Sequence, residues 1–232
     1  MNLHNLPKGS RRYLDIARKL GDDIDTGLYT AGQRLPPERE LAQVLDASRT
    51  TVREALLALE IMRFIEIRVG AGVFVLDEVH RNAPGMTEPD SSSPSEVLEA
   101  RRILEGETAA RAAQNATEND ITMLNRNVLK MAASIDDVAR FDAADSEFHA
   151  EIARISRNDV IVGLVTHLWK MRESNMWSRW YDQTRNPQNR RRTVDDHQTI
   201  VKAIERHLPD AARTAMQTHL DVLADRFYEL KL

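Results

Sequence analysis

The stretch from Ser48 to Glu60 constrains the fold most, because its pattern predicts one amphipathic helix with its own start signal. Its apolar residues recur at helical spacing along one face: Val52, Ala55, Leu56 and Leu59. Ser48 stands where an N-cap belongs, since its hydroxyl can accept from the unpaired N–H groups of the first turn. Arg49, Thr50 and Arg53 are expected to project from the opposite face. A solvated charged face would look the same, so the neighbouring sequence has to decide.

The neighbouring segments predict a winged helix-turn-helix. Residues 38–45 form a short helical pattern, and two residues leave a tight turn before Ser48, so the second helix is the one that enters a DNA major groove. Residues 65–69 alternate in polarity, and an apolar β-rich run, residues 73–76, follows a glycine pair; two such runs predict a β-hairpin, the wing. In that arrangement Arg49 and Arg53 can take base edges, and the hydroxyls of Thr50 and Thr51 can take phosphates.

Three segments closely resemble the winged helix of GntR-family transcription regulators. They are residues 35–42 (LPPERELA), 48–55 (SRTTVREA) and 68–72 (RVGAG). The resemblance implies a double-stranded operator DNA partner, a DNA contact from Arg39, and a wing whose Gly70 lets the backbone approach the minor groove. Val69 stands where relatives often carry Lys or Arg, which puts one wing contact in doubt.

Composition excludes several other classes of protein. The chain has 232 residues and no cysteine, so a disulfide framework and thiolate chemistry are excluded. No apolar run approaches the roughly 20 residues of a membrane span, and no signal-peptide segment is present, so we expect a cytoplasmic protein with no membrane partner. The net charge is −4, but residues 1–76 carry eleven Lys/Arg against ten Asp/Glu, and the rest carries twenty-one against twenty-six. DNA affinity should therefore rest on a local arginine cluster.

We expect a mainly α protein in three parts. Residues 1–76 form the winged helix with its small hairpin, residues 77–94 a linker rich in Pro, Gly and Ser, and residues 95–232 an antiparallel all-α bundle. Bundle helices are predicted at about 95–114, 119–134, 138–156, 159–174, 190–207 and 209–230, and residues 177–189 are left open. One reader helix covers too few base pairs for specificity, so a homodimer on a near-palindromic operator is expected.

Four polar side chains fall on the apolar stripes of three bundle helices: Asp145, His149, His197 and His219. A lone histidine there is usually a satisfied core residue, and we expect His167, on another stripe, to be one or to line a pocket. Four such groups on three helices are a different case from a lone histidine. Asp and His four residues apart share a helix face, and a bundle core lets side chains of several helices converge on an ion. Three imidazoles and a carboxylate suit Zn²⁺ first, or Ni²⁺, Mn²⁺ or Fe²⁺.

Residues 145–149, 196–200 and 215–220 resemble the effector-binding FCD domain of the FadR subgroup. The resemblance implies that the four side chains hold a divalent metal ion and that Arg101 faces the effector. A guanidinium beside a metal can clamp a carboxylate, although Arg101 could instead pair with Glu105, four residues on. Residues 168–172 and 176–180 are similar to the branch that controls sugar-acid (hexuronate or aldonate) use, so a sugar acid is expected, with a hydroxy acid such as lactate as the alternative.

These features together predict a DNA-binding transcription regulator, as a repressor, whose operator affinity responds to a small carboxylate effector at a metal site. A metalloenzyme competes, because such a site could activate water, but the sequence offers no separate general acid or nucleophile. A constitutive architectural DNA binder would leave the polar groups of the bundle unexplained. Long acyl effectors are disfavoured, since the ion and imidazoles would be buried against hydrocarbon.

Overall fold

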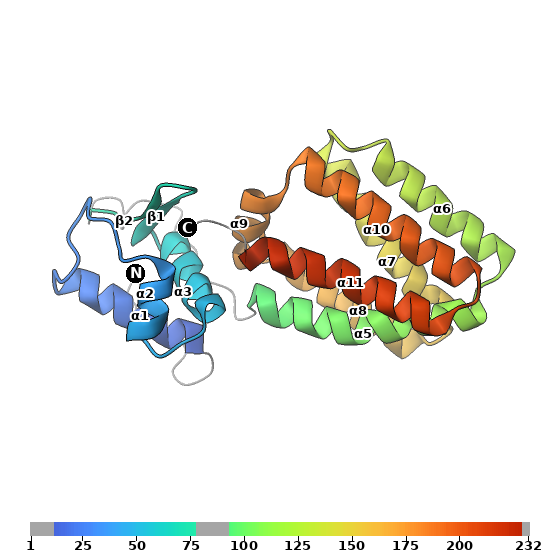
Figure 1. The fold of residues 1–232 in the computed structure, drawn as a ribbon, viewed down its shortest axis with the longest axis horizontal. Coiled ribbons are helices and arrows are strands. Elements are labelled where there is room, and N and C mark those ends of the chain that lie inside the picture. The colour runs from blue at the N-terminus through green and yellow to red at the C-terminus, as the bar shows by residue number, and fades with distance from the viewer. Residues whose placement is uncertain (1–11, 78–92, 229–232) are drawn as a thin grey trace. The chain divides into compact units, whose positions relative to one another are not determined.

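The computed structural model describes residues 12–77 and 93–228, except for the side chains of residues 183, 227 and 228 (Figure 1). The expected N-terminal arm and most of the expected linker lie outside this range. By contacts between Cα atoms, the chain divides into two compact units. The N-terminal unit extends to Pro94 and also takes in Ser174–Gln183, and the bundle unit comprises Ser95–Glu173 and Thr184–Phe227. The domain bounds expected from the sequence remain a prediction.

The N-terminal unit begins with a winged helix-turn-helix, as predicted. Its elements are α1 (Arg12–Asp25), α2 (Glu38–Val44), the reader helix α3 (Arg49–Ile61), β1 (Ile65–Arg68) and β2 (Gly72–Val75). The two strands pair antiparallel, with Ile65 opposite Val75 and Arg68 opposite Gly72. The apolar stripes of α1 and α3 and the inward side chains of the hairpin are buried together in one small core.

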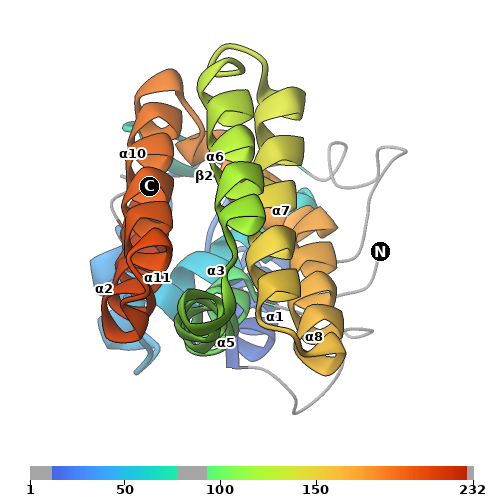
Figure 2. The same ribbon diagram turned by 90° about the vertical axis from the view of Figure 1, so that its right-hand side faces the viewer.

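The bundle unit consists of helices with short connections, as predicted. They are α5 (Pro94–Asn115), α6 (Glu118–Ala132), α7 (Val138–Ile155), α8 (Asp159–Lys170), the 3₁₀ turn η2 (Met171–Glu173), α10 (Pro187–Glu205) and α11 (Pro209–Tyr228). In Figure 2, α6 lies between α10 and α7, and α8 lies on the far side of α7, in agreement with the contacts between these helices. Local signals start several of them: Thr117 and Asp120 form a capping box, and Asp137, Asn158 and Asn186 are side-chain N-caps.

The stretch left open by the sequence, residues 177–189, contains most of α9 (Asn175–Thr184) and the start of α10. A second difference concerns His167, which is exposed on α8, so its assignment to the core is wrong. The stripe that it shares with Leu164 faces outward, because periodicity identifies an apolar face but not what covers it. Among the described residues, no helix is long and apolar enough to cross a membrane.

Candidate functional site

The start of the reader helix presents polar groups outward. Ser48 is its N-cap, and its Oγ accepts from the backbone N–H of Thr51 at 3.0 Å. Arg49 and, on α2, Arg39 are exposed, and Thr50 and Thr51 are partly exposed. The N–H groups of the first turn that Ser48 does not cap, together with the helix dipole, favour the binding of a phosphate group.

Arg53 does not share this face, so its expected outward orientation is wrong. Its side chain is only 2% exposed, and its Nη2 donates to Glu38 Oε2 at 2.5 Å. Arg53 immediately follows the buried Val52 and lies at the edge of the apolar stripe, where its long side chain can reach the first residue of α2. Arg53 therefore links α3 to α2 through this ion pair.

The wing turn is exposed and depends on glycine. Gly70 and Gly72 have φ values of +77° and +117°, a region that residues with a Cβ rarely adopt. A Cβ on Gly72 would also lie 2.3 Å from Arg34 Nε, whereas one on Gly70 would meet nothing within 4 Å. Gly70 thus leaves its backbone accessible at the tip of the wing, beside Val69.

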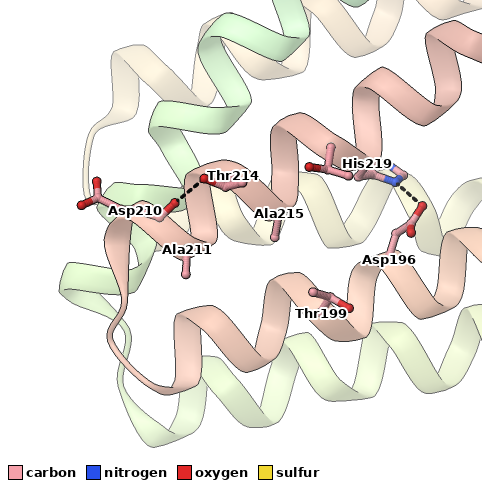
Figure 3. A pocket seen from close by; sticks show the side chains of 8 residues that line it. Asp196, Thr199, Asp210, Ala211, Thr214, Ala215 and His219 are labelled. Carbon is pink, nitrogen blue, oxygen red and sulfur yellow. Dashed lines mark hydrogen bonds and ion pairs between the residues drawn. The ribbon is translucent and has the colours of Figure 1, made fainter.

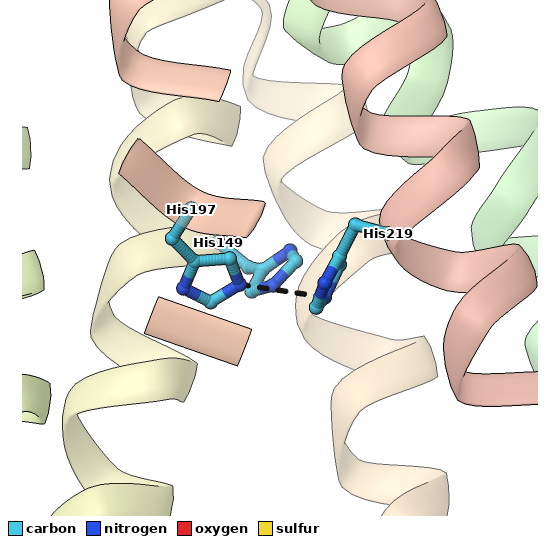
Figure 4. A group of neighbouring side chains, drawn as sticks. All are labelled: His149, His197 and His219. Atoms are coloured by element: carbon cyan, nitrogen blue, oxygen red, sulfur yellow. Dashed lines mark hydrogen bonds between the residues drawn. The ribbon is translucent and has the colours of Figure 1, made fainter. Parts of the chain in front are cut away.

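The four predicted metal ligands come together in the core of the bundle. His197 Nε2 lies 3.5 Å from Asp145 Oδ1 and 3.3 Å from His219 Nε2. His149 Nε2 lies 3.7 Å from the same Asp145 oxygen. One ring nitrogen from each imidazole lies within 4.8 Å of the other two, and Figure 4 shows the three rings converging. All four side chains are buried.

This arrangement fits a divalent metal ion. Asp145 Oδ1 and His149 Nε2 are buried without a hydrogen-bond partner among the described residues, which is costly unless a ligand pairs with them. Burial, together with the neighbouring His219 and His149, lowers the pKa of His197 well below its usual value. Burial likewise lowers the pKa of His219, although its bond with Asp196 opposes the shift. Neutral imidazole is the form that binds metals.

Outer partners orient the imidazoles. His149 Nδ1 contacts Glu105 Oε2, His219 Nδ1 lies 3.4 Å from Asp196 Oδ2, and the His197 ring stacks on Phe148 at 4.2 Å. Burial opposes the ionisation of Glu105, but Arg101 and His149 more than offset it and hold its pKa below the usual value. Because Glu105 occupies Nδ1 of His149, its Nε2 is left for the cluster.

Arg101 is buried, as expected, and the alternative pairing is also present: its Nε donates to Glu105 Oε1 at 2.6 Å. Its Nη1 is buried without a hydrogen-bond partner among the described residues. Two further side chains that were not predicted from the sequence, Trp169 and Arg172, lie beside this site. The guanidinium carbons of Arg101 and Arg172 lie 4.4 and 4.0 Å from the Trp169 ring, and Arg172 Nη1 lies 3.4 Å from Asp145 Oδ2. The only sequence signal for these two residues was that segment 168–172 resembles the sugar-acid branch of the family.

A groove of about 550 Å³ between α10 and α11 reaches the cluster from outside. Figure 3 shows it ending at the paired Asp196 and His219, with Thr199 and Thr214 along its length. Small alanines and threonine hydroxyls line it, so polar molecules can approach the outer side of His219.

Comparison with known proteins agrees with both parts of the chain. Residues 12–75 match the model of the bacterial regulatory proteins of the gntR family, and residues 96–222 match the FCD domain. The chain belongs to the GntR family. It is 35% identical to the Uxu operon regulator of Haemophilus influenzae, over 99% of this chain and 86% of that protein. It is 33% identical to the Exu regulon transcriptional regulator of Escherichia coli K12, over 91% and 82%.

This GntR-family member also shares its fold with a solved structure, E. coli McbR/YncC, with a TM-score of 0.54 and 20% identity over 95% of this chain and 99% of that one. The family and the relatives identify a DNA-binding transcription regulator and not an enzyme. The predicted fold class, family and domain types are therefore confirmed.

Proposed function

We propose that this regulator is a repressor that releases its operator when a small carboxylate binds at a metal site in the FCD domain. The observation that supports it most is the convergence of four ligand-type side chains from α7, α10 and α11 beside the guanidiniums of Arg101 and Arg172. Asp145, His149, His197 and His219 would hold the ion. Zn²⁺ is our first candidate, and Ni²⁺, Mn²⁺ or Fe²⁺ would also suit this donor set.

The charges around the cluster favour an anionic effector. Arg101 and Arg172 balance Glu105 and Asp145, and Asp196, 23% exposed, adds one negative charge. A bound divalent ion would supply two positive charges, leaving a surplus of one. Since an uncompensated buried charge is costly, one carboxylate is the group that best restores neutrality.

A sugar acid suits the remaining polar atoms. Arg101 Nη1 and Trp169 Nε1 are buried donors without a hydrogen-bond partner among the described residues, and hydroxyl oxygens could accept from both. We propose that the carboxylate and its adjacent hydroxyl face the metal ligands and Arg101. The Uxu and Exu relatives carry names from the hexuronate pathway, which also favours this class.

Titrating galacturonate, glucuronate, gluconate and lactate into a complex of the metal-loaded protein with its operator tests the effector. We expect a sugar acid to weaken operator binding by about 5–150-fold, the usual size of an allosteric coupling. Release by lactate alone would replace the sugar acid with a hydroxy acid at the same site. Release by none of them, with metal bound, would contradict the proposed sensing role.

For the DNA complex, we propose contacts from Arg39, Ser48, Arg49, Thr50 and Thr51, with the backbone at Gly70 in the minor groove. Arg49 is exposed at the start of the reader helix and suits a guanine edge. Arg53, which is buried, is no longer among the proposed contacts.

We also propose that a second copy of the chain covers α8. Val160 is 72% and Leu164 50% exposed on this apolar helix, and only Val165 of the helix is buried. Gly163 lies between them with nothing near its Cα face, so another helix can approach closely. A homodimer also supplies the two reader helices that a near-palindromic operator requires.

A Leu164→Lys substitution is expected to raise the dimer dissociation constant at least about tenfold. The side chain would occur twice in a symmetric interface, and burying one leucine contributes about 1.5–3 kcal/mol. Analytical ultracentrifugation measures the change, and Leu129→Lys on α6, where Leu129 is 69% exposed, is the matched control. An unchanged dimer with Leu164→Lys would remove α8 from the interface.

A further inference from the structure

Helix α9 packs with the DNA-binding unit although its sequence lies between bundle helices. Residues Ser174–Gln183 have their contacts with the N-terminal unit, whereas the segments before and after them belong to the bundle unit. The chain therefore leaves the bundle after η2, forms α9 and re-enters at Thr184. Such an excursion is more than a linker requires, because a short loop from η2 to α10 would connect the bundle helices.

Helix α9 makes a polar contact with the end of the reader helix. Arg179 holds Glu60 with two hydrogen bonds, Nε to Oε2 at 2.7 Å and Nη2 to Oε1 at 2.5 Å. The bond to Glu60 raises the pKa of Arg179 against the effect of burial. Glu60 Oε1 also accepts from the backbone N–H of Ile67 in β1, at 2.9 Å. One buried carboxylate thus joins the reader helix, the wing and α9.

Space lies beside this ion pair. A cavity of about 540 Å³ in the N-terminal unit is lined by residues of α9, the end of α3 and the wing, with charged groups that include Arg63, Glu66 and Asp182. Met176, Trp177 and Trp180 of α9 are buried, but the cavity leaves the charged groups that line it room to shift, which close packing would not allow. The Arg179–Glu60 ion pair therefore fixes the position of α9 against the end of the reader helix.

The chain just before α9 forms part of the effector site. Arg172, in η2, lies against Trp169 and Asp145, and only Glu173 and Ser174 separate it from the first residue of α9. The three Cα–Cα steps from Arg172 to Asn175 span at most about 11 Å, so a displacement at Arg172 reaches α9 with little slack. A carboxylate bound beside Asp145 and Arg101 would change the contact between Asp145 and Arg172 and so displace η2.

We infer that α9 carries the effector response to the DNA-binding face, with Arg179 positioning the reader helix and the wing through Glu60. The coupling part of this inference rests on the proposed function, while the positioning part stands without an effector. The ligand acts because it binds two arrangements of η2 and α9 with different affinity, which is the requirement for any allosteric effect.

The test compares the full-length wild type with Arg179→Gln, using Arg192→Gln, an exposed arginine of α10, as control. Without effector, Arg179→Gln should change operator affinity about two- to fivefold, the effect of losing a partly exposed ion pair. Metal content and galacturonate affinity of the DNA-free protein should match the wild type. The factor by which galacturonate weakens operator binding should fall from about 5–150 towards one.

Two further variants keep the test decisive. Glu60→Gln combined with Arg179→Gln should add little to the single changes, because both remove one interaction. If Arg179→Gln proves unstable, Arg179→Lys retains the charge and loses the double hydrogen bond. Wild-type coupling in a folded Arg179 variant would overturn the transmission route. If the wild type responds to no sugar acid, the proposed effector fails, and an unchanged operator affinity in Arg179→Gln would then overturn the positioning role separately.

Discussion

Replacing Arg53 by alanine should destabilise the winged helix by about 3–5 kcal/mol, the usual cost of removing one partner of a buried ion pair. The substitution leaves the carboxylate of Glu38, 7% exposed, without its guanidinium. Thermal unfolding of the full chain, followed by calorimetry, should show the N-terminal transition at a lower temperature. The double variant Arg53→Leu with Glu38→Leu should recover most of the loss, because an apolar pair of similar volume avoids the unpaired charge.

Arg49→Ala is the matched comparison, one helical turn away. We expect stability within about 0.5 kcal/mol of the wild type, as is usual for an exposed residue. Operator affinity should fall by about 1–3 kcal/mol through loss of a base contact. If Arg53→Ala instead left the unfolding temperature unchanged and weakened DNA binding as Arg49→Ala does, Arg53 would be a DNA contact and its buried pairing would be irrelevant in solution.

The second large effect concerns the metal. Zn²⁺ supplied at about a thousand times its dissociation constant should stabilise the chain by about 4 kcal/mol, since it binds only the folded cluster. Each kcal/mol raises the melting temperature by roughly 2–4 °C in a chain of this size. His197→Ala removes a fully buried side chain that we propose as a metal ligand, so this shift and the bound metal should both disappear.

His167→Ala, which changes an exposed histidine of α8, should keep the full thermal shift. Elemental analysis of protein purified without chelator provides the direct measure of bound metal. An equal shift in wild type and His197→Ala would mean that the ion binds elsewhere and that the four side chains are only a polar core.

Periodicity predicted the helices well because one buried face is enough to define each of them. The expected range of α7, 138–156, differs from Val138–Ile155 by one residue, and the stripe that places Phe141 and Phe148 inward also places Asp145 and His149 there. Ser48 marked the start of the reader helix through the chemistry of its cap. These features are local, and the sequence carries local information directly.

Features that depend on distant partners were harder to predict. The direction of Arg53 depends on Glu38, fifteen residues away, because a long side chain at the edge of an apolar stripe can turn either way. Trp169 and Arg172 join the site from the end of α8 and from a 3₁₀ turn, where there is no long periodic pattern. The packing of α9 with the N-terminal unit is a matter of tertiary contacts, and no sequence period reports it.

The distribution of indole rings has a spectroscopic consequence. Of the three tryptophans in the chain, Trp169 stacks against two guanidiniums and lies 4.8 Å from the His149 ring, while Trp177 and Trp180 are buried on α9. The protein therefore contains natural fluorophores at both ends of the proposed signalling route. Emission from Trp169 is expected to change when the proposed metal site is occupied, and emission from the other two to change with the environment of α9, without any added label.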